Sequence, residues 1–188
     1  MSYKIEFKNY LDELHKSLCE VSDWMYENPE LGFEEFKTSK HLVDYIQKNS
    51  KSVNYPSHGL ETAFDVTFGD DGPLVVICVE YDALPEIGHA CGHNIIATAS
   101  IGAGLGLKDI ASKLGIRVKL LGTPAEEGGG GKIILIDEGA FEDASCSMMI
   151  HPGYEDVVNP TFTTIQQYTV EYFGKDAHAA GAPDQGIN

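Results

Sequence analysis

The stretch LVVICVE, from Leu74 to Glu80, decides the fold of this 188-residue chain. Its first six residues are all apolar, and four of them are β-branched. An apolar run without alternating polar residues is typical of a strand that is covered on both faces, as in a parallel sheet. We therefore expect a parallel sheet with helices packed on both of its sides.

Strands and helices alternate on either side of this run. The residue pattern predicts strands at 63–68, 116–121 and 145–150 and helices at 7–27, 34–47, 93–110 and 131–138. The helix at 93–110 is rich in small residues, which favours close packing on the sheet, and the strand at 145–150 is predicted to be short and buried. This strand-helix-strand order predicts an α/β protein with a three-layer sandwich.

The pattern changes near residues 152–160, which precede a long β-rich segment at residues 161–173. We place a domain boundary here. Residues 1–157 are predicted to form one domain, and residues 158–188 to begin a second. So short a segment cannot bury a core by itself, so the second unit is either completed by another chain or cut short.

Charge and composition exclude several classes of function. The chain carries 29 acidic and 13 basic residues, a formal net charge of −16, which leaves no positive surface for nucleic acid or anionic lipid. It has no apolar run of about 18 residues and no signal-peptide core at its N-terminus, so we expect a soluble, cytoplasmic protein. Its four cysteines are far apart, which argues against a disulfide framework or a zinc ribbon.

The first chemical cluster is GHACGHN, at residues 88–94. Cys91 and His93 are two residues apart, so in an extended segment their side chains project to the same side and can converge on a metal ion. His93 also opens the following helix, whose dipole favours the thiolate form of Cys91 that binds metal. By itself the pair is equally compatible with a structural cysteine beside a hydrogen-bonded histidine.

The second cluster is the pair Glu126 and Glu127, within TPAEEG at the end of the strand at residues 116–121. Adjacent carboxylates at a strand end point in different directions, so one can bind a metal while its neighbour accepts a proton. A solvated acidic turn is the alternative interpretation. The position at the end of a strand favours the interpretation as a metal ligand beside a proton acceptor.

A third candidate, His151, directly follows the strand at residues 145–150. Ligand sites in open α/β sheets lie beyond the carboxyl ends of the strands. The side chains that this rule brings to one crevice are Asp82, Cys91, His93, Glu126, Glu127 and His151. Their shared position favours a functional site more strongly than any one motif does.

Five motifs in this order resemble the M20 family of metal-dependent peptidases and amidohydrolases. Similarity is greatest to the branch with aminobenzoyl-glutamate hydrolases, N-acyl-amino-acid hydrolases and dipeptidases. The motifs are EYDALP (80–85), GHACGHN (88–94), TPAEEG (123–128), HPG (151–153) and GKDAHAA (174–180). The resemblance implies the three-layer sandwich of the zinc exopeptidases, followed by the start of a smaller α+β lid or dimerisation domain.

The resemblance also implies a role for each candidate side chain. The implied metal ligands are Cys91, His93, Glu127 and His151. Glu126 would be the general base. We group Asp82 with it as a catalytic candidate, because its position after the strand lets it support a metal ligand from outside the coordination shell. His178, in the last motif, would bind substrate and stabilise the oxyanion across a dimer. Thiolate and imidazole ligands favour zinc, although manganese or another first-row ion fits a carboxylate-rich position.

The implied activity is hydrolysis of an amide or peptide bond next to a free carboxylate, in a small N-acyl amino acid or dipeptide, by a homo-oligomer. M20 proteins are longer and supply a further metal-binding histidine, so this chain resembles an N-terminal fragment. We therefore expect at most one tightly bound metal, self-association, and weak or absent hydrolysis. The alternative is a catalytically silent metal-binding or dimerising remnant. Turnover at a stoichiometric metal content separates the two.

Overall fold

The computed structural model describes residues 2–158, 160–161 and 168–187. The chain forms two compact units, Met1–Gly153 and Tyr154–Asn188. In the second unit a short 3₁₀ helix, Pro183–Gln185, lies in the sequence between Lys175 and Ile187, which form an isolated bridge. Of the β-rich segment expected at residues 161–173, residues 162–167 lie outside the described residues, and residues 161 and 168–173 lie in no strand, so the expectation is wrong for them. The division at residue 157 into a catalytic and a lid domain stays a prediction.

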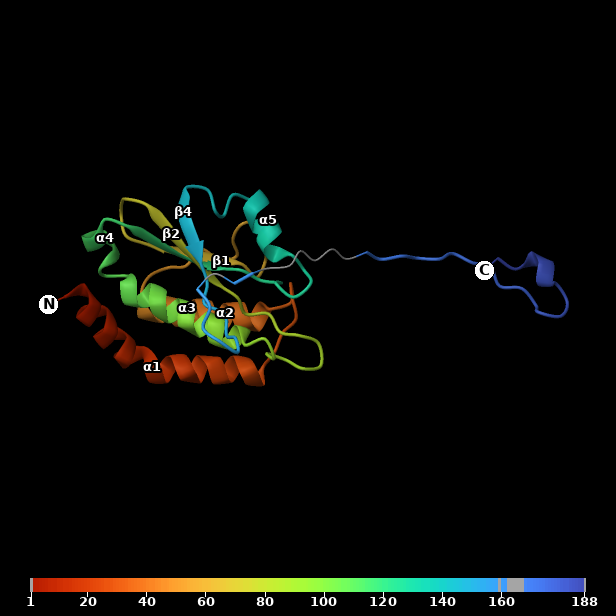
Figure 1. The fold of residues 1–188 in the computed structure, drawn as a ribbon, viewed down its shortest axis with the longest axis horizontal. Coiled ribbons are helices and arrows are strands. Elements are labelled where there is room, and N and C mark those ends of the chain that lie inside the picture. The colour runs from red at the N-terminus through yellow and green to blue at the C-terminus, as the bar shows by residue number, and fades with distance from the viewer. Residues whose placement is uncertain (1, 159, 162–167, 188) are drawn as a thin grey trace. The chain divides into compact units, whose positions relative to one another are not determined.

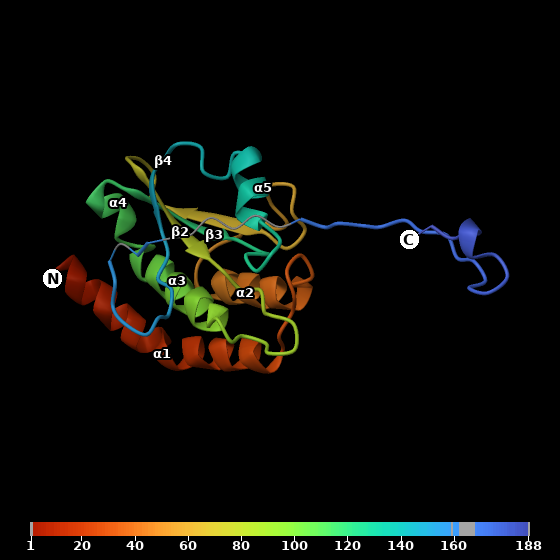
Figure 2. The same ribbon diagram turned by 45° about the vertical axis from the view of Figure 1, so that its right-hand side comes forward.

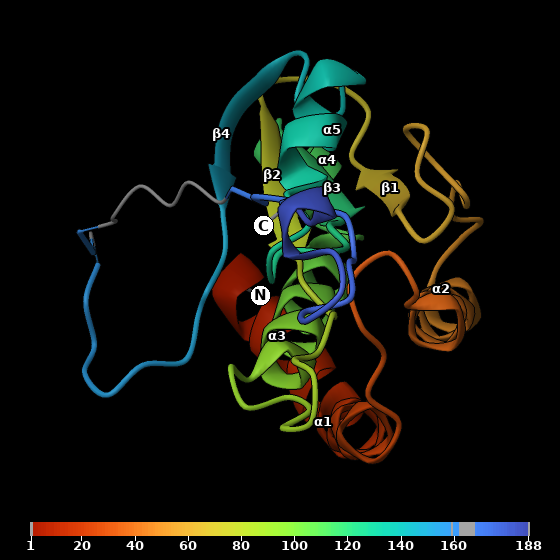
Figure 3. The ribbon, with the colours of Figure 1, turned by 90° about the vertical axis from the view of Figure 1, so that its right-hand side faces the viewer.

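A four-stranded mixed sheet organises the first unit. Its strands are β1 (Phe64–Phe68), β2 (Leu74–Val79), β3 (Arg117–Gly122) and β4 (Ala144–Met148), in the order β1-β3-β2-β4 (Figure 3). β2 lies between β3 and β4 and runs parallel to both, whereas β1 is antiparallel to β3. The expected parallel sheet is therefore wrong for β1. The link from β1 to β2 is too short for a crossover helix, so the two strands run in opposite directions.

Helices cover both faces of this sheet (Figures 1 and 2). One face carries α1 (Tyr3–Glu27), α2 (Phe36–Asn49) and α3 (His93–Leu107), and the other carries α5 (Gly131–Asp137). A short helix, α4 (Ala111–Leu114), connects α3 to β3. The predicted three-layer α/β sandwich is confirmed. Among the described helices, none combines the length and the apolar character that crossing a membrane requires.

The apolar run at residues 74–80 forms the centre of two separate cores, because its residues alternate between the two faces of the sheet. Ile77 and Val79 belong to the core under α1, α2 and α3, whereas Val76 and Cys78 belong to the core under α5. A strand with both faces covered needs no polar alternation, which explains the unbroken apolar sequence.

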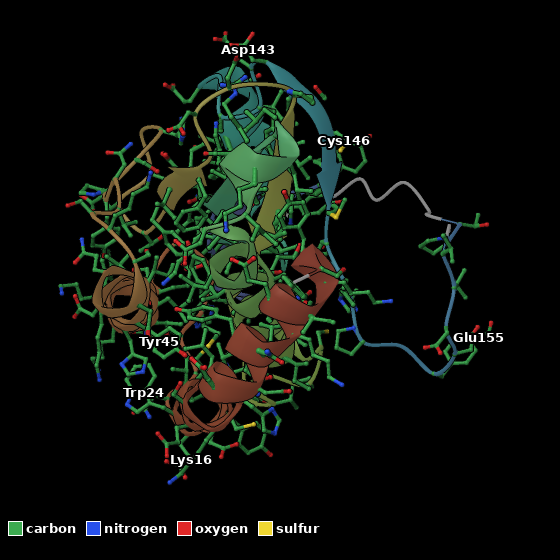
Figure 4. All side chains as sticks on the ribbon, turned by 90° about the vertical axis from the view of Figure 1, so that its left-hand side faces the viewer. Lys16, Trp24, Tyr45, Asp143, Cys146 and Glu155 are labelled. Atoms are coloured by element: carbon green, nitrogen blue, oxygen red, sulfur yellow. The ribbon has the colours of Figure 1, made fainter. Side chains whose placement is uncertain are left out.

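The last strand differs from the prediction. A buried strand was expected at residues 145–150, but β4 ends at Met148 and is largely exposed. β4 forms one edge of the described sheet, where Cys146 lies exposed (Figure 4). Ile150 is also 75% exposed. The apolar residues that suggested burial include Met148 and Ile150. They are exposed because β4 pairs only with β2, and no described residues cover its other edge.

The two long N-terminal helices are joined by polar and aromatic contacts. Trp24 of α1 stacks on His41 of α2 with ring centroids 4.2 Å apart. The hydroxyl groups of Ser17 and Tyr45 are hydrogen-bonded at 2.7 Å, and Figure 4 places Trp24 and Tyr45 on these two helices. The contacts fix α2, which begins at the loop that supports the candidate site.

Close packing of α3 on the sheet depends on its small residues, as the sequence suggested. A Cβ atom at Gly104 would lie 2.5 Å from the Cγ and one Cδ of Leu120, a fully buried residue of β3. Real carbon atoms do not approach so closely. Glycine at this position therefore sets the distance between the helix and the sheet.

We expect Gly104→Ala to destabilise the fold, although alanine is about 1 kcal/mol more favourable than glycine inside a helix. The added methyl group overlaps Leu120, and overpacking of this kind costs about 1–3 kcal/mol. Urea unfolding followed by circular dichroism measures the difference. In a Leu120→Ala background the space is open, so the same substitution should become neutral or stabilising. An equal loss in both backgrounds would contradict the packing argument.

Candidate metal centre and active site

The candidate residues come from the carboxyl ends of the three parallel strands. Asp82 follows β2, the pair Glu126 and Glu127 follows β3, and His151 follows β4. His93 is the first residue of α3, directly after Gly92, which adopts a left-handed conformation with φ of 77°. The sheet topology thus brings together residues that are up to 69 positions apart in the sequence, from Asp82 to His151.

Hydrogen bonds to Asp82 fix the position of His93. His93 is buried, and its Nδ1 lies 2.8 Å from the backbone oxygen of Asp82 and 3.1 Å from the Oδ1 of the same residue. The other carboxylate oxygen of Asp82 accepts a hydrogen bond of 2.8 Å from the backbone N–H of Glu127. Asp82 therefore positions both His93 and the loop after β3 that carries Glu126 and Glu127, called the acidic loop below.

The pKa values of Asp82 and His93 shift in opposite directions. Burial raises the pKa of Asp82, but the hydrogen bonds from His93 and from the Glu127 backbone outweigh it, so the pKa lies below its usual value. Burial lowers the pKa of His93, but its hydrogen bond to Asp82 and the charges of Asp82 and Glu80 outweigh it, so the pKa lies above its usual value. The surroundings of the imidazole therefore favour positive charge next to it, whether from a proton or from a metal cation.

Three carboxylates surround the second nitrogen of His93. The Nε2 atom lies 3.5 Å from Oε2 of Glu80, 3.8 Å from Oε2 of Glu126 and 3.9 Å from Oε1 of Glu127. Neither Nε2 of His93 nor Oε2 of Glu80 has a hydrogen-bond partner among the described residues, although both atoms are buried. Buried polar atoms without partners are rare, so this arrangement needs a further positive group.

His151 lies next to the same nitrogen. Its ring meets that of His93 edge to face, with centroids 6.0 Å apart. One ligand atom each from Glu80, His93 and His151 lie within 4.8 Å of one another. The same holds for His93, Glu126 and Glu127, so two possible ligand groups share His93.

Cys91 contacts the site from its rim. Its thiol is hydrogen-bonded to the side chain of Glu127, and it belongs to neither of the two ligand groups. The hydrogen bond to Glu127 is the main cause that raises the pKa of Cys91 to about 11, followed by burial and by the charges of Glu127 and Glu126. The expected thiolate-favouring effect of the helix dipole is therefore outweighed here by nearby carboxylates.

Glu126 and Glu127 differ in exposure although they are neighbours. The side chain of Glu126 is 43% exposed and that of Glu127 is 25% exposed. Burial is the main cause that raises the pKa of Glu126, and the negative charges of Glu80 and Glu127 raise it further. A partly exposed carboxylate with a raised pKa suits proton transfer at neutral pH.

These residues fit a divalent metal ion. The imidazole and carboxylate groups, with a thiol at the rim, form the nitrogen, oxygen and sulfur donor set that first-row metals take in proteins. The unpartnered Nε2 of His93 can give its electron pair to a metal ion, and the raised pKa of His93 indicates that the surroundings favour positive charge. A bound cation would satisfy both conditions.

His178 lies in the second unit, so its relation to this site stays a prediction. Its Nδ1 accepts hydrogen bonds from the backbone N–H groups of Ala180 at 3.3 Å and Gly181 at 2.9 Å. These contacts fix the ring within its own motif. They leave Nε2 as the atom with which the imidazole can meet another group.

Sequence reasoning missed three residues around the site: Glu80, Lys132 and Glu35. For Glu80 the available signals were its place at the end of an apolar run and at the start of the EYDALP motif, but neither assigned it a role. Lys132, on α5, contacts the carboxylate of Glu80. Nothing in the sequence connects either residue to the other, because 51 residues separate them.

Glu35 holds the backbone of the acidic loop by a hydrogen bond. It is fully buried, and its carboxylate accepts hydrogen bonds from the backbone N–H of Ala125 at 2.8 Å and from the hydroxyl of Thr62 at 2.9 Å. Ala125 has a φ of 55°, which is uncommon for a residue other than glycine. Glu35 therefore holds the strained residue that immediately precedes Glu126. Burial raises the pKa of Glu35.

Comparison with known proteins identifies the fold and its relatives. No protein-family model matches the chain. The chain is 38% identical to an Xaa-Arg dipeptidase from Mus musculus and 30% identical to a p-aminobenzoyl-glutamate hydrolase chain from Escherichia coli, over 95% and 89% of its own length. A dinuclear metal-binding M20 peptidase from Bacillus subtilis superimposes with a TM-score of 0.66 at 24% identity, over 72% of this chain and 42% of that one. The chain belongs to the M20 family.

This M20 chain spans 44% of the mouse relative and 39% of the E. coli relative, less than half of each. The family and the fold class expected from the sequence are confirmed. The likeness to the solved structure concerns the fold alone. The role of each residue in the M20 site stays a prediction.

We expect Glu35→Ala to destabilise this M20 chain by about 1–3 kcal/mol, because the buried N–H of Ala125 would lose its acceptor. Glu34→Ala is the matched control, since the neighbouring glutamate is exposed and its loss should change stability by less than about 0.5 kcal/mol. Urea unfolding of both variants measures the difference. Equal effects of the two substitutions would contradict the supporting role of Glu35.

Proposed function

We propose that this chain provides the metal-binding half of a hydrolase that cleaves the amide or peptide bond of a small N-acyl amino acid or dipeptide. The observation that carries the proposal is the placement of Glu126. Its carboxylate oxygen lies 3.8 Å from Nε2 of the buried His93, and its side chain is 43% exposed. A proton-accepting group beside a metal site is the arrangement that metal-assisted hydrolysis requires.

The proposed metal ligands are Cys91, His93, Glu127 and His151. We propose zinc as the ion, because it accepts sulfur, nitrogen and oxygen ligands, with manganese or another first-row ion as the alternative. The chemistry that a bound divalent ion supplies is Lewis acidity, which polarises the scissile carbonyl group and acidifies water.

The chain's own residues would divide the remaining work. Glu126 would accept a proton from the attacking water on one carboxylate oxygen and later donate it to the leaving amine. Asp82 would hold Nδ1 of His93 by the hydrogen bond at 3.1 Å, which keeps the imidazole in place while charge changes around it. His178 would bind the substrate and stabilise the oxyanion.

The relatives support the substrate class. The similar mouse and human proteins are named Xaa-Arg dipeptidase, and similar bacterial proteins are named p-aminobenzoyl-glutamate hydrolase and N-acetyl-L-cysteine deacetylase. These names share an amide bond to an amino acid. We propose a substrate of this kind, with no nucleic-acid or membrane partner, and a cytoplasmic location that suits four free thiols.

Glu126→Gln and Glu127→Gln should have different effects although the residues are neighbours. In an active, full-length background we expect Glu126→Gln to retain metal and to lower turnover by about a hundred- to ten-thousand-fold, because it removes the base. Glu127→Gln should lose metal. Elemental analysis and hydrolysis of a panel of N-acyl amino acids and dipeptides give the two readouts as ratios to the parent chain.

Cys91→Ser is the control for metal content in the same assay. If Cys91 is a ligand, its substitution lowers metal stoichiometry while the far-ultraviolet circular dichroism spectrum is kept. Metal binding without any turnover by the parent chain would favour a catalytically silent remnant. Full turnover by Glu126→Gln would overturn the proposed base.

We propose that the chain also forms homo-oligomers through the sheet edge at β4. Unpaired strand edges with exposed apolar side chains favour association, and Met148 is 53% exposed at the end of this strand. Dimerisation through a lid domain, as the family resemblance suggests, is a second route.

Association through the β4 edge predicts that Met148→Lys lowers the mean mass measured by light scattering after size-exclusion chromatography, because an edge charge opposes strand pairing. Tyr26→Lys is the matched control, since Tyr26 is exposed on α1, away from that edge. A parent chain that is monomeric at every concentration would refute association. A mass unchanged by Met148→Lys would refute the edge as its route.

A further inference from the structure

Glu80 is a buried carboxylate for which the proposed function so far gives no role. It directly follows β2 and is only 1% exposed. An ionised carboxylate is costly to bury unless each oxygen finds a partner, because the interior solvates charge poorly. The surroundings of its two oxygens therefore indicate what the group does.

The two oxygens of Glu80 meet different groups. Oε1 contacts the Nζ atom of Lys132, which reaches it from α5 on the other face of the sheet. Oε2 has no hydrogen-bond partner among the described residues and lies 3.5 Å from Nε2 of His93. Lys132 thus satisfies one oxygen and leaves the second one directed at the imidazole.

The contact between Glu80 and His93 brings together two electron-pair donors. Both neighbours of Nδ1 are oxygens of Asp82, so Nδ1 carries the hydrogen of the neutral imidazole and donates it. Nε2 then presents a lone pair to Oε2 of Glu80, which presents another. At 3.5 Å two acceptors repel each other unless a positive group binds to both. A proton on Nε2 would be such a group, but 3.5 Å is long for a charge-assisted hydrogen bond.

His151 adds a third donor at the same place, because its ligand atom and those of Glu80 and His93 all lie within 4.8 Å of one another. Two imidazoles and one carboxylate make a common ligand set for first-row divalent metals. This group is distinct from the set of His93, Glu126 and Glu127, although both share His93.

We infer that Glu80 is itself a metal ligand, binding through Oε2, and that Lys132 is a positioning residue that holds Oε1. The inference rests on the proposed function, which requires the ion. Lys132 directs one oxygen of Glu80 toward His93 and offsets part of the negative charge that Glu80, Glu126 and Glu127 concentrate there. Binding of the metal through a single oxygen follows from this contact.

Titration of the 188-residue chain with Co²⁺ tests the inference, because visible absorption reports ligand number and a charge-transfer band reports the bond from Cys91. We expect Glu80→Gln to weaken Co²⁺ binding by about tenfold or more and to change the ligand-field bands. Lys132→Met should keep the stoichiometry, and its affinity should change less than that of Glu80→Gln. Asp137→Asn, an exposed charge on the same helix as Lys132, should leave the titration unchanged.

A merely structural ion pair predicts a different pattern. If Glu80 only pairs with Lys132, both single variants lose similar thermal stability and neither changes the Co²⁺ spectrum, which overturns the inference. The double variant Glu80→Gln with Lys132→Met removes both charges and leaves no unpaired lysine, so it covers the case in which Glu80→Gln does not fold. It should still show the weakened Co²⁺ binding.

The same titration separates this inference from the proposed function. Unchanged binding by Glu80→Gln, together with loss of the charge-transfer band in Cys91→Ser, overturns the role of Glu80 and leaves the metal centre intact. A parent chain that binds no Co²⁺ overturns both.

Discussion

The hydrogen bond between Nδ1 of His93 and Asp82 is the constraint on which the rest of the site depends. Asp82 follows β2, His93 begins α3, and the second oxygen of Asp82 holds the backbone of Glu127 after β3. One carboxylate therefore joins three elements of the fold. It also sets the tautomer of the imidazole, which leaves Nε2 free to meet the carboxylates on the other side.

The fold supplies this constraint through packing at the centre of the sheet. β2 is covered on both faces and lies between two parallel neighbours, so its carboxyl end cannot move independently of β3 and β4. Gly104 lets α3 approach β3 closely, and Glu35 holds the backbone of Ala125 from α2's side of the sheet. The geometry of the site thus depends on residues that are not themselves candidate ligands.

The electrostatics of the site oppose the stability of the chain. Glu80, Glu126 and Glu127 surround one imidazole nitrogen. Among the described residues, Lys132 is the one lysine that forms an ion pair with any of them, and its partner is Glu80. Such a concentration of like charge raises the free energy of the folded state, which is expected where a site is built to attract a cation. The buried, unpartnered atoms of His93 and Glu80 are part of the same cost.

The sequence by itself determined the class of the fold and the cluster of candidate ligands. The apolar run at residues 74–80 required cover on both faces, and parallel strands place their carboxyl ends at one edge, so Asp82, Glu127 and His151 could be grouped in advance. Local pattern and spacing are sufficient for such predictions, because period and strand direction are properties of short segments.

Only the tertiary structure decided the direction of β1, the exposure of β4, and the contacts of Glu80, Lys132 and Glu35. Each depends on residues distant in sequence: Glu35 meets Ala125 across 90 positions, and Lys132 meets Glu80 across 52. A charged residue has the same local signature whether it lies in solvent or beside a buried partner. The difference arises only when packing removes water and leaves each charge the partners that the fold provides.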